Sequence, residues 1–281
     1  MESAIERHNR MVKEERLQAE RVRTDGGGSA DIWKHRAHQF RPKQDEHDLV
    51  IDLVADLAGP YGKVIDVGAG GGRIAIPLSY RISEVIAVEP SEAMQSVLQA
   101  EISHRGIRNI RIIPTSWENA EIDPAEVVLA SHVTYGVQDI EPFLRKMDQK
   151  AARRAAVVVF TDPPQNALAP FWEYIYGEPR LRLPCRDELL DVLIELGVKP
   201  EIIELPPQPP QPIGNPDEAF AELRRRLFIG QGNPLEKRLR AAMQALTIER
   251  DGLIWIKDAQ PNQRSLIHWQ GGSMRATQTW I

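Results

Sequence analysis

A glycine-rich turn is the stretch whose residue types and spacing point most directly to chemistry. From Val64 to Arg73 the chain reads Val-Ile-Asp-Val-Gly-Ala-Gly-Gly-Gly-Arg, an apolar strand followed by glycines and then a helical pattern. Glycine lets the backbone pass close to a ligand, and N–H groups at the start of a helix can hydrogen-bond it. The turn therefore predicts a site for a nucleotide-like ligand, although tight packing of a helix on a sheet produces the same pattern.

The spacing of the glycines excludes two common nucleotide sites. A dinucleotide fingerprint read from Gly68 requires glycine where Arg73 stands, and no Gly-Lys-Ser/Thr triplet of a phosphate-binding P-loop follows. Instead, Asp66 stands two residues before the first of three alternating glycines, Gly68, Gly70 and Gly72.

With this motif the chain resembles the class I S-adenosylmethionine-dependent methyltransferases, over roughly Trp33 to Trp269. In that family an acid at the place of Glu89, after the second apolar run, binds both ribose hydroxyls, which suits the two oxygens of a carboxylate at the carboxyl edge of a sheet. The resemblance implies S-adenosyl-L-methionine as the cofactor. It implies that the cofactor-binding residues are Asp66, Gly68, Ala69, Gly70, Gly72, Glu89, Pro90, Ser116, Trp117, Ser131 and His132.

Two stretches, at 116–117 and at 162–164, differ from known methyltransferase patterns. Ser116 stands where the family usually has an aspartate for the adenine amine, and a hydroxyl accepts a hydrogen bond more weakly than a carboxylate. Trp117 is as compatible with packing against adenine as with the protein core. The Asp-Pro-Pro of 162–164 resembles the motif of methyltransferases for base and glutamine nitrogens, but it follows the fifth apolar run and lacks the terminal aromatic residue. We interpret it as a turn that ends a strand.

Two residues after the fourth apolar run are candidate catalytic residues. In-line methyl transfer requires alignment, exclusion of water and removal of a proton from a nucleophile of high pKa. His132 is the candidate base because histidine titrates near neutral pH, and packing or a hydrogen bond to the cofactor is the alternative. Tyr135 could orient a substrate, and with Trp33 and Phe40 it could face the sulfonium. Ordinary packing is the alternative for each aromatic residue.

Alternating elements must position these residues. Short β-branched runs lie at 64–67, 85–88, 110–113, 127–130 and 155–160, separated by helical stretches. Runs that are apolar on both faces are typical of parallel strands covered by helices on both sides. The sequence therefore predicts an α/β fold with a doubly wound sheet. The resemblance implies the Rossmann-like methyltransferase form of this sheet, mostly parallel with an antiparallel last strand. We also expect a strand near 201–205 and a closing strand pair, 253–256 with 265–269.

The predicted organisation is a charged N-terminal arm with a glycine-rich hinge at 1–30 and a methyltransferase domain at 31–281. We interpret the arm as solvated, with a partner-binding or lid helix as the alternative. A helical insertion or lid occupies about 206–250, after a proline-rich connection and with Asn215 as an N-cap. Aromatic residues at 165–182 fit either a pocket wall or packing within the lid. Six basic residues fit either an acidic substrate or a solvated face: Arg224, Arg225, Arg226, Lys237, Arg238 and Arg240.

Composition limits the class of protein. The 281 residues carry a net charge of −5 and a single cysteine, Cys185, which excludes an internal disulfide and a four-thiolate metal site. We expect no metal. We also expect a cytoplasmic protein without a membrane partner, because no long apolar run occurs and the first thirty residues are too charged for a signal peptide. The mildly acidic balance weighs against nucleic acid as a partner.

These observations predict an enzyme that transfers a methyl group to oxygen, nitrogen or carbon of a small-molecule acceptor. One alternative is an RNA or protein methyltransferase, for which the basic helices would be the docking surface. Another is a non-catalytic S-adenosylmethionine-binding module that regulates a partner through the N-terminal arm. The sequence leaves open whether the protein forms a homodimer.

Overall fold

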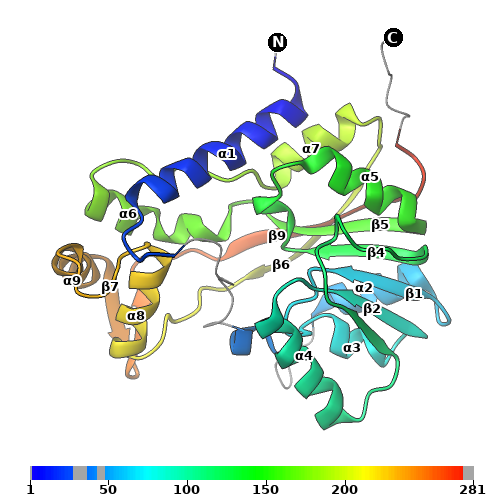
Figure 1. The fold of residues 1–281 in the computed structure, drawn as a ribbon, viewed down its shortest axis with the longest axis horizontal. Coiled ribbons are helices and arrows are strands. Elements are labelled where there is room, and N and C mark those ends of the chain that lie inside the picture. Colours follow the sequence, from blue (N-terminus) through cyan, green and yellow to red (C-terminus); the bar gives the residue numbers. More distant parts are fainter. Residues whose placement is uncertain (1, 28–36, 43–47, 275–281) are drawn as a thin grey trace.

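The computed structural model describes residues 2–27, 37–42 and 48–274, which are organised around a seven-stranded sheet (Figure 1). The strand order is β3-β2-β1-β4-β5-β9-β6, and β9 runs antiparallel to both of its neighbours whereas the other pairs are parallel. The strands are β1 Lys63–Val67, β2 Glu84–Val88, β3 Ile110–Ile113, β4 Ala125–Ser131, β5 Ala151–Phe160, β6 Glu201–Gln208 and β9 Asn262–Gln270. The predicted fold class is confirmed, and the strand order reverses between β1 and β4, where sheets of this kind bind ligands.

Helices cover both faces of the sheet. They are α2 Leu49–Ala58, α3 Ala75–Ser79, α4 Glu92–Arg105, α5 Ile140–Lys150 and α7 Arg186–Glu195. The first three pack on the face that carries Val64, and α5 and α7 pack on the face that carries Ile65. Both side chains are fully buried, which confirms the prediction of parallel strands enclosed by helices.

Local sequence signals set the ends of several helices. Asp48 caps α2 by accepting a hydrogen bond from Val50 N over 3.1 Å. Asn215 caps α8 (Pro216–Arg226) as predicted, with acceptor distances of 3.1 and 3.0 Å. Gly106 ends α4 in the left-handed conformation, with φ 64°. Within the described part of the chain, none of the helices combines the length and the apolar character that a membrane span requires.

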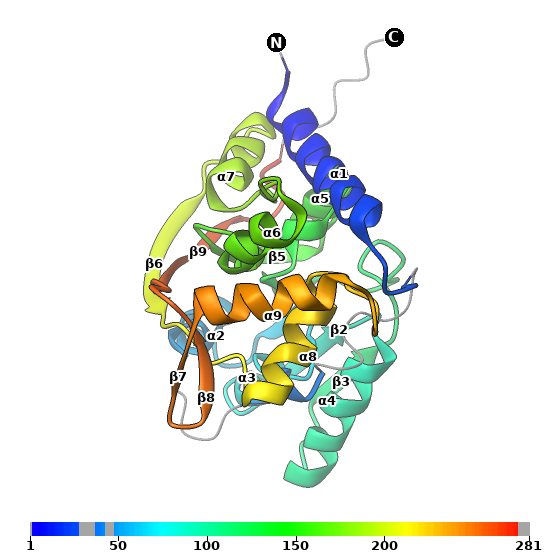
Figure 2. The same cartoon turned by 90° about the vertical axis from the view of Figure 1, so that its left-hand side faces the viewer.

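The segments that follow β5 and β6 share a hydrophobic core, here called the insertion core. It joins α6 (Ala169–Tyr176), α8, α9 (Leu235–Leu246) and the end of α1 (Ala4–Val22), which face the viewer in Figure 2. Its buried residues are Ala19, Leu168, Phe171, Trp172, Ile175, Leu223, Leu227, Ile229, Leu239 and Ala242. Phe171 and Trp172 are fully buried. Packing is therefore their observed role, as the second of our two interpretations expects.

The predicted closing pair of strands is wrong. β8 (Leu253–Ile256) forms a hairpin with β7 (Thr247–Arg250), whereas β9 lies in the main sheet between β5 and β6. The hairpin turns at Asp251 and Gly252, whose φ angles of 51° and 74° match the twist of antiparallel strands. Residues 265–269 are buried, because β5 and β6 cover both edges of β9 and a hydrophobic cluster covers each of its faces.

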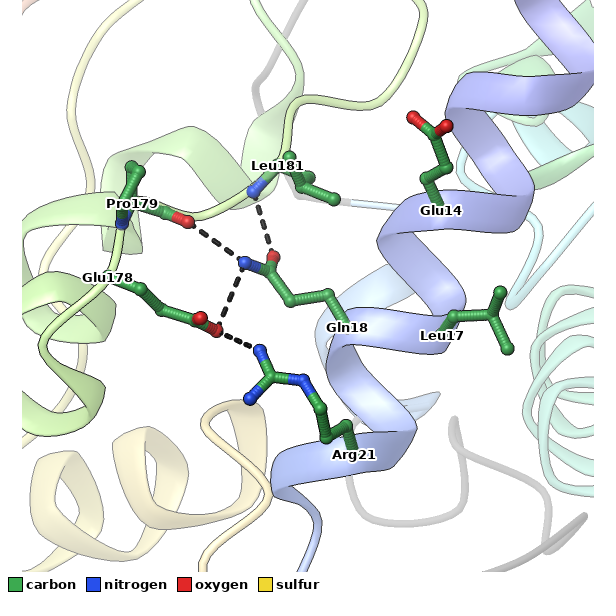
Figure 3. A pocket seen from close by; sticks show the side chains of 7 residues that line it. All are labelled: Glu14, Leu17, Gln18, Arg21, Glu178, Pro179 and Leu181. Carbon is green, nitrogen blue, oxygen red and sulfur yellow. Dashed lines mark hydrogen bonds and ion pairs between the residues drawn. The ribbon is translucent and has the colours of Figure 1, made fainter.

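The prediction of a solvated N-terminal arm is also wrong. One face of α1 is buried against α5, α7 and the segment 178–181, through His8, Val12, Gln18 and Ala19. In Figure 3, Gln18 donates a hydrogen bond to the carbonyl of Pro179 over 2.9 Å and accepts one from the N–H of Leu181 over 2.8 Å. These contacts fix α1 to the domain beside a shallow pocket. The predicted hinge extends into residues 28–30, outside the described residues.

Candidate active site

The glycine turn after β1 forms one wall of the candidate site. Gly68, Gly70 and Gly72 have φ angles of 69°, 56° and 90°, which a residue with a Cβ atom rarely adopts. Space is a second constraint, because a Cβ on Gly68 would lie 2.7 Å from Cγ2 of Val133 and one on Gly72 would lie 2.6 Å from Cδ1 of Leu98. The absence of Cβ atoms therefore lets the turn pack closely against Val133, which follows β4, and against Leu98 of α4.

Four N–H groups of this turn bond within the protein. Those of Gly68 and Ala69 donate to the last carbonyl of β2, over 2.8 and 3.2 Å, and that of Gly72 donates to Ala69 over 3.1 Å. Gly70 donates to Oε2 of Glu89 over 2.8 Å. These four donors are thus not available to a phosphate, and the turn instead allows close approach and holds an acid.

Glu89 lies directly after β2 and is 5% exposed. Its Oε2 accepts the hydrogen bond from Gly70, and its Oε1 accepts one from the N–H of Ser91 at the start of α4, both over 2.8 Å. A carboxylate presents two acceptor oxygens side by side, which matches a ligand that carries two neighbouring hydroxyls. Two elements of the fold fix its orientation for that task.

Asp66 is the second acid of the site. It lies in β1, is 1% exposed, and its Oδ2 has no hydrogen-bond partner among the described residues. Burial, followed by the negative charge of Glu89, raises the pKa of Asp66 to about 7. A buried, unpartnered carboxyl oxygen beside another acid is typical of a ligand site.

The remaining predicted cofactor residues lie at the carboxyl ends of neighbouring strands. Pro90 follows β2 and is exposed, Ser116 follows β3, and Ser131 ends β4. The side chain of Trp117 belongs to the core: it is 3% exposed, meets Phe143 edge-on and donates from Nε1 to the Phe143 carbonyl over 3.2 Å. Of the two interpretations of this tryptophan ring, the structure supports the core one.

The structure brings His132 and Tyr135 together. His132 has φ 60°, its ring stacks on Phe160 with centroids 4.3 Å apart, and its Nδ1 lies 3.0 Å from the Tyr135 hydroxyl. The Phe160 N–H donates to the same hydroxyl over 2.7 Å. Burial, followed by the positive charges of Arg73 and Arg264, lowers the pKa of His132 to about 3, so the imidazole is neutral at physiological pH.

Sequence reasoning missed three charged residues beside His132. Arg264, at the start of β9, donates to both oxygens of Asp48 over 2.9 and 3.0 Å, and Arg73 lies 3.9 Å from the same carboxylate. Burial opposes ionisation of Asp48, but the hydrogen bonds and charge of Arg264, with the charge of Arg73, bring its pKa below the ordinary value. Its position as the N-cap of α2 could have drawn attention to Asp48 in the sequence, whereas nothing in the sequence marks Arg264 as its partner.

The aromatic residues predicted to face a sulfonium differ in their surroundings. Phe40 lies against the glycine turn, where a Cβ on Gly71 would come within 2.9 Å of the Phe40 carbonyl oxygen. Tyr135 is 7% exposed and bonded as described above. Trp33 lies outside the described residues.

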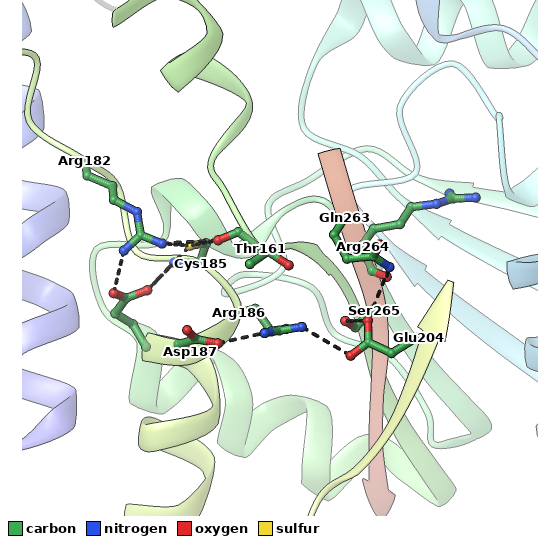
Figure 4. Close-up of polar contacts among 10 residues, drawn as sticks. Thr161, Arg182, Cys185, Arg186, Asp187, Glu204, Gln263, Arg264 and Ser265 are labelled. Atoms are coloured by element: carbon green, nitrogen blue, oxygen red, sulfur yellow. Dashed lines mark hydrogen bonds and ion pairs between the residues drawn. The ribbon is translucent and has the colours of Figure 1, made fainter. Parts of the chain in front are cut away.

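A second polar cluster, at the end of β5, has a structural role (Figure 4). The thiol of Cys185 donates to the carbonyl of Thr161 over 2.8 Å, and Arg182 donates to Sγ over 2.6 Å and to Glu188 over 2.9 Å. Burial raises the pKa of Cys185 to about 12, so the thiol stays protonated. In the part of the chain that the structure describes, no group of His, Cys, Asp and Glu residues could hold a metal ion.

The residues at the sheet edge fit S-adenosylmethionine. The turn permits close approach of a ligand, and four of its N–H groups donate hydrogen bonds within the protein. This arrangement suits a ligand that has no phosphate at the turn. Glu89 offers a fixed carboxylate to a ribose, and the paired acids Asp66 and Glu89 favour a ligand that carries positive charge.

Comparisons with known proteins agree with this fit. Residues 32–197 match the family model described as a methyltransferase domain. The release factor glutamine methyltransferase of Escherichia coli is 28% identical over 119 residues, which cover 42% of this chain and 43% of that protein. The chain spans about two fifths of the length of the first curated relatives that it matches.

Two solved structures share the fold. The YcgJ protein of Bacillus subtilis has a TM-score of 0.52 at 17% identity, covering 80% of this chain and 98% of that one. Magnesium protoporphyrin IX methyltransferase of Synechocystis PCC 6803, with bound SAH, has a TM-score of 0.51 at 14% identity, covering 94% of this chain and 96% of that one. The family match over 32–197 covers more than half of this chain. The chain therefore belongs to the methyltransferase-domain family, whose enzymes take their methyl group from S-adenosylmethionine.

Proposed function

We propose that this chain transfers the methyl group of S-adenosylmethionine to a small-molecule acceptor beside His132 and Tyr135, at the carboxyl end of β4. The observation that carries the proposal is the carboxylate of Glu89, held by two backbone N–H groups next to the glycine turn. Beside it lies Asp66, whose Oδ2 has no hydrogen-bond partner among the described residues. A fixed carboxylate in this place suits a ribose.

The proposed roles divide the site into two parts. The cofactor is bound by Asp66, Gly68, Ala69, Gly70, Gly72, Glu89, Pro90, Ser116, Trp117 and Ser131. Trp117 contributes through its backbone, because its ring lies in the core. His132 and Tyr135 form the acceptor side, where the stack on Phe160 holds the imidazole.

The chemistry asks little of the protein beyond positioning. The bound cofactor supplies an electrophilic methyl group on a sulfonium. The chain aligns the acceptor with that methyl group and excludes water, since an in-line displacement forms no covalent bond to the enzyme. The rigid cluster of His132, Tyr135 and Phe160 suits this task because hydrogen bonds and stacking fix each member.

Two observations support a small acceptor. Basic residues of the insertion are engaged within the protein: Arg225 donates to Glu222 over 2.8 Å, Arg240 lies 4.0 Å from the ring centre of Phe220, and Arg238 donates to a backbone carbonyl over 3.1 Å. Such contacts leave a poorer docking surface for RNA phosphates. A neighbour of the same fold is named for a small acceptor, magnesium protoporphyrin IX.

Label transfer tests the proposal. The protein is incubated with S-adenosylmethionine carrying a tritiated methyl group and, separately, with metabolite, protein and RNA fractions of a cell extract. We expect label in the metabolite fraction, and we expect Glu89→Ala to reduce it. Label in the protein or RNA fraction alone would assign the acceptor to that class instead, and the curated relative named for a release factor makes protein the first alternative.

A further inference from the structure

The hydroxyl of Tyr135 has two neighbours that together determine where its proton lies. The N–H of Phe160, at the end of β5, can only donate, and it reaches the hydroxyl oxygen over 2.7 Å. Nδ1 of His132 lies 3.0 Å from the same oxygen. The oxygen has a second lone pair, but if it also accepted from Nδ1 its own proton would have no acceptor, because Nδ1 is the one acceptor that the described residues bring to this hydroxyl. The buried hydroxyl therefore donates to Nδ1. Nδ1 is then the acceptor, and the proton of the neutral imidazole is on Nε2.

The imidazole ring is held from several sides. It stacks on the Phe160 ring with an interplanar angle of 22°, and the backbone N–H of His132 donates to the carbonyl of Val158 over 2.8 Å. Tyr135 and Phe160 are each 7% exposed, whereas His132 is only part-buried. The hydrogen bonds among the described residues involve Nδ1 and leave Nε2 without a partner. Nε2 is therefore the ring nitrogen left for a ligand.

We infer that Tyr135 is a positioning residue that locks His132 as the Nε2–H tautomer, so that His132 donates a hydrogen bond to the methyl acceptor instead of removing its proton. This inference rests on the proposed function. It reverses the role of general base that the sequence predicts for His132. An acceptor for such a site is an oxygen that ionises without help from the enzyme, as in a carboxylic acid or an acidic phenol.

The reaction then needs no proton transfer to the protein. One lone pair of the acceptor oxygen takes the hydrogen bond from Nε2, and another forms the bond to the methyl carbon while the carbon–sulfur bond breaks toward sulfur. The lowered pKa of His132, near 3, is consistent with a ring that stays neutral throughout. The charged groups that act on it are Arg73, Arg264 and Asp48, and the pair of Asp48 with Arg264 keeps that carboxylate ionised.

The tautomer is directly measurable in the full-length protein without any acceptor. Long-range proton–nitrogen NMR correlations, with nitrogen-labelled histidine and with His132→Gln to assign the signal, report which ring nitrogen carries the proton. We expect Nε2–H from pH 6 to pH 8. Tyr135→Phe should release the lock and give a mixture, whereas the exposed Tyr174→Phe should change nothing. A proton on Nδ1, or an imidazolium near neutral pH, would overturn the inference.

Conservative variants separate a donor from a base. The side-chain amide of glutamine can take the place of Nε2–H, whereas that of asparagine reaches only to the place of Nδ1. With label transfer into the metabolite fraction as the readout, His132→Asn should lower the rate by about 10²-fold, the usual loss of one hydrogen-bond donor in an active site. His132→Gln should retain most of the rate. Equal losses in both variants would contradict a donor role.

The labelled product identifies the acceptor class. A methyl ester or an aryl methyl ether, recognised by mass spectrometry, supports an acidic oxygen acceptor, and a methylated amine or aliphatic alcohol contradicts it. Failure of this inference is distinguishable from failure of the proposed function. SAH is S-adenosylhomocysteine, the product that remains after methyl transfer. If calorimetry shows that SAH binds to the protein but the proton is on Nδ1, only the tautomer lock is wrong. If SAH does not bind, the proposed function is wrong whatever the tautomer.

Discussion

The carboxylate of Glu89 accepts a hydrogen bond from the backbone N–H of Gly70 over 2.8 Å. The bond connects the end of β2 with the turn after β1, two strands that are neighbours in the sheet. The acid proposed to hold the ribose is thus oriented by the same turn that gives the cofactor room. Acid and turn are separately testable.

Replacing Glu89 with alanine should weaken binding of S-adenosylmethionine by about 1–3 kcal/mol, because charge-assisted hydrogen bonds to the ribose are lost. Isothermal calorimetry measures the change. Asp123→Ala removes an exposed carboxylate from the loop before β4 and is the matched control, with no change expected. Unchanged affinity in Glu89→Ala would mean that another residue binds the ribose.

Replacing Gly68 with alanine should destabilise the fold more than the same change at Gly106. Both have positive φ, 69° and 64°, but only the new Cβ at position 68 meets a close neighbour, Val133 Cγ2 at 2.7 Å, whereas nothing lies within 4 Å at position 106. We expect an additional loss of about 1–3 kcal/mol in the free energy of unfolding, measured with urea. Gly68→Ala combined with Val133→Ala should recover part of it. No recovery would show that the contact is not the cause.

Arg180 should be important for attachment of α1. Its ion pair with Glu15 spans 2.9 Å with side chains only 6% and 12% exposed, and its guanidinium lies 4.8 Å from the ring centre of Trp172. Arg180→Ala leaves a buried charge without its partner, so we expect a loss of about 3–5 kcal/mol in urea unfolding. Arg16→Ala breaks the exposed ion pair of Arg16 with Glu20 on α1, whose side chains are 67% and 51% exposed, and should lower the free energy of unfolding by about 0–1 kcal/mol. Similar losses in the two variants would contradict the difference in burial.

The raised pKa of Asp66 predicts that the stability of the fold depends on pH. Its pKa rises from 3.8 to about 7 on folding, so between these values the native state binds the proton and the unfolded state does not. The contribution of Asp66 to stability is therefore present below pH 4 and is lost as the pH rises toward 7. Each pKa unit corresponds to about 1.4 kcal/mol, so the loss is large enough to measure.

Urea unfolding of Asp66→Asn at several pH values checks this sign. Between pH 5 and pH 7 the variant should lose less stability than the wild type, because its side chain does not titrate. Asp123→Asn should follow the wild type. If the stability of the wild type changed between pH 5 and pH 7 by the same amount as that of Asp66→Asn, Asp66 would already be ionised in the folded protein.

The sheet was predictable where each element carries its own signal. Val64 and Ile65 show the double-sided apolar pattern of a buried parallel strand, and Asn215 is a local cap. The resemblance implies an antiparallel last strand, but the partners of β9 were not predictable from its own residues, because β5 and β6 are remote in the chain. The β7–β8 hairpin had a usable signal in Asp251-Gly252, a favoured hairpin turn that our prediction did not use.

The same distinction applies to the site. The motif from Asp66 to Gly72 and the acid Glu89 are local in sequence, and the structure brings them together. The bond between Tyr135 and the Phe160 N–H joins residues that are 25 positions apart, and the left-handed conformation of His132 has no local signature. The sequence therefore indicates that a histidine lies at this strand end, whereas its protonated nitrogen depends on a tertiary contact.

Calorimetry with S-adenosylmethionine and with SAH tests the central claim most directly. The measurement uses the full chain, with Glu89→Ala and Asp123→Ala beside it. We predict saturable binding of both ligands in the micromolar to low-millimolar range, weakened in the first variant and unchanged in the second. If neither ligand bound to the folded protein up to low-millimolar concentration, the account would be contradicted.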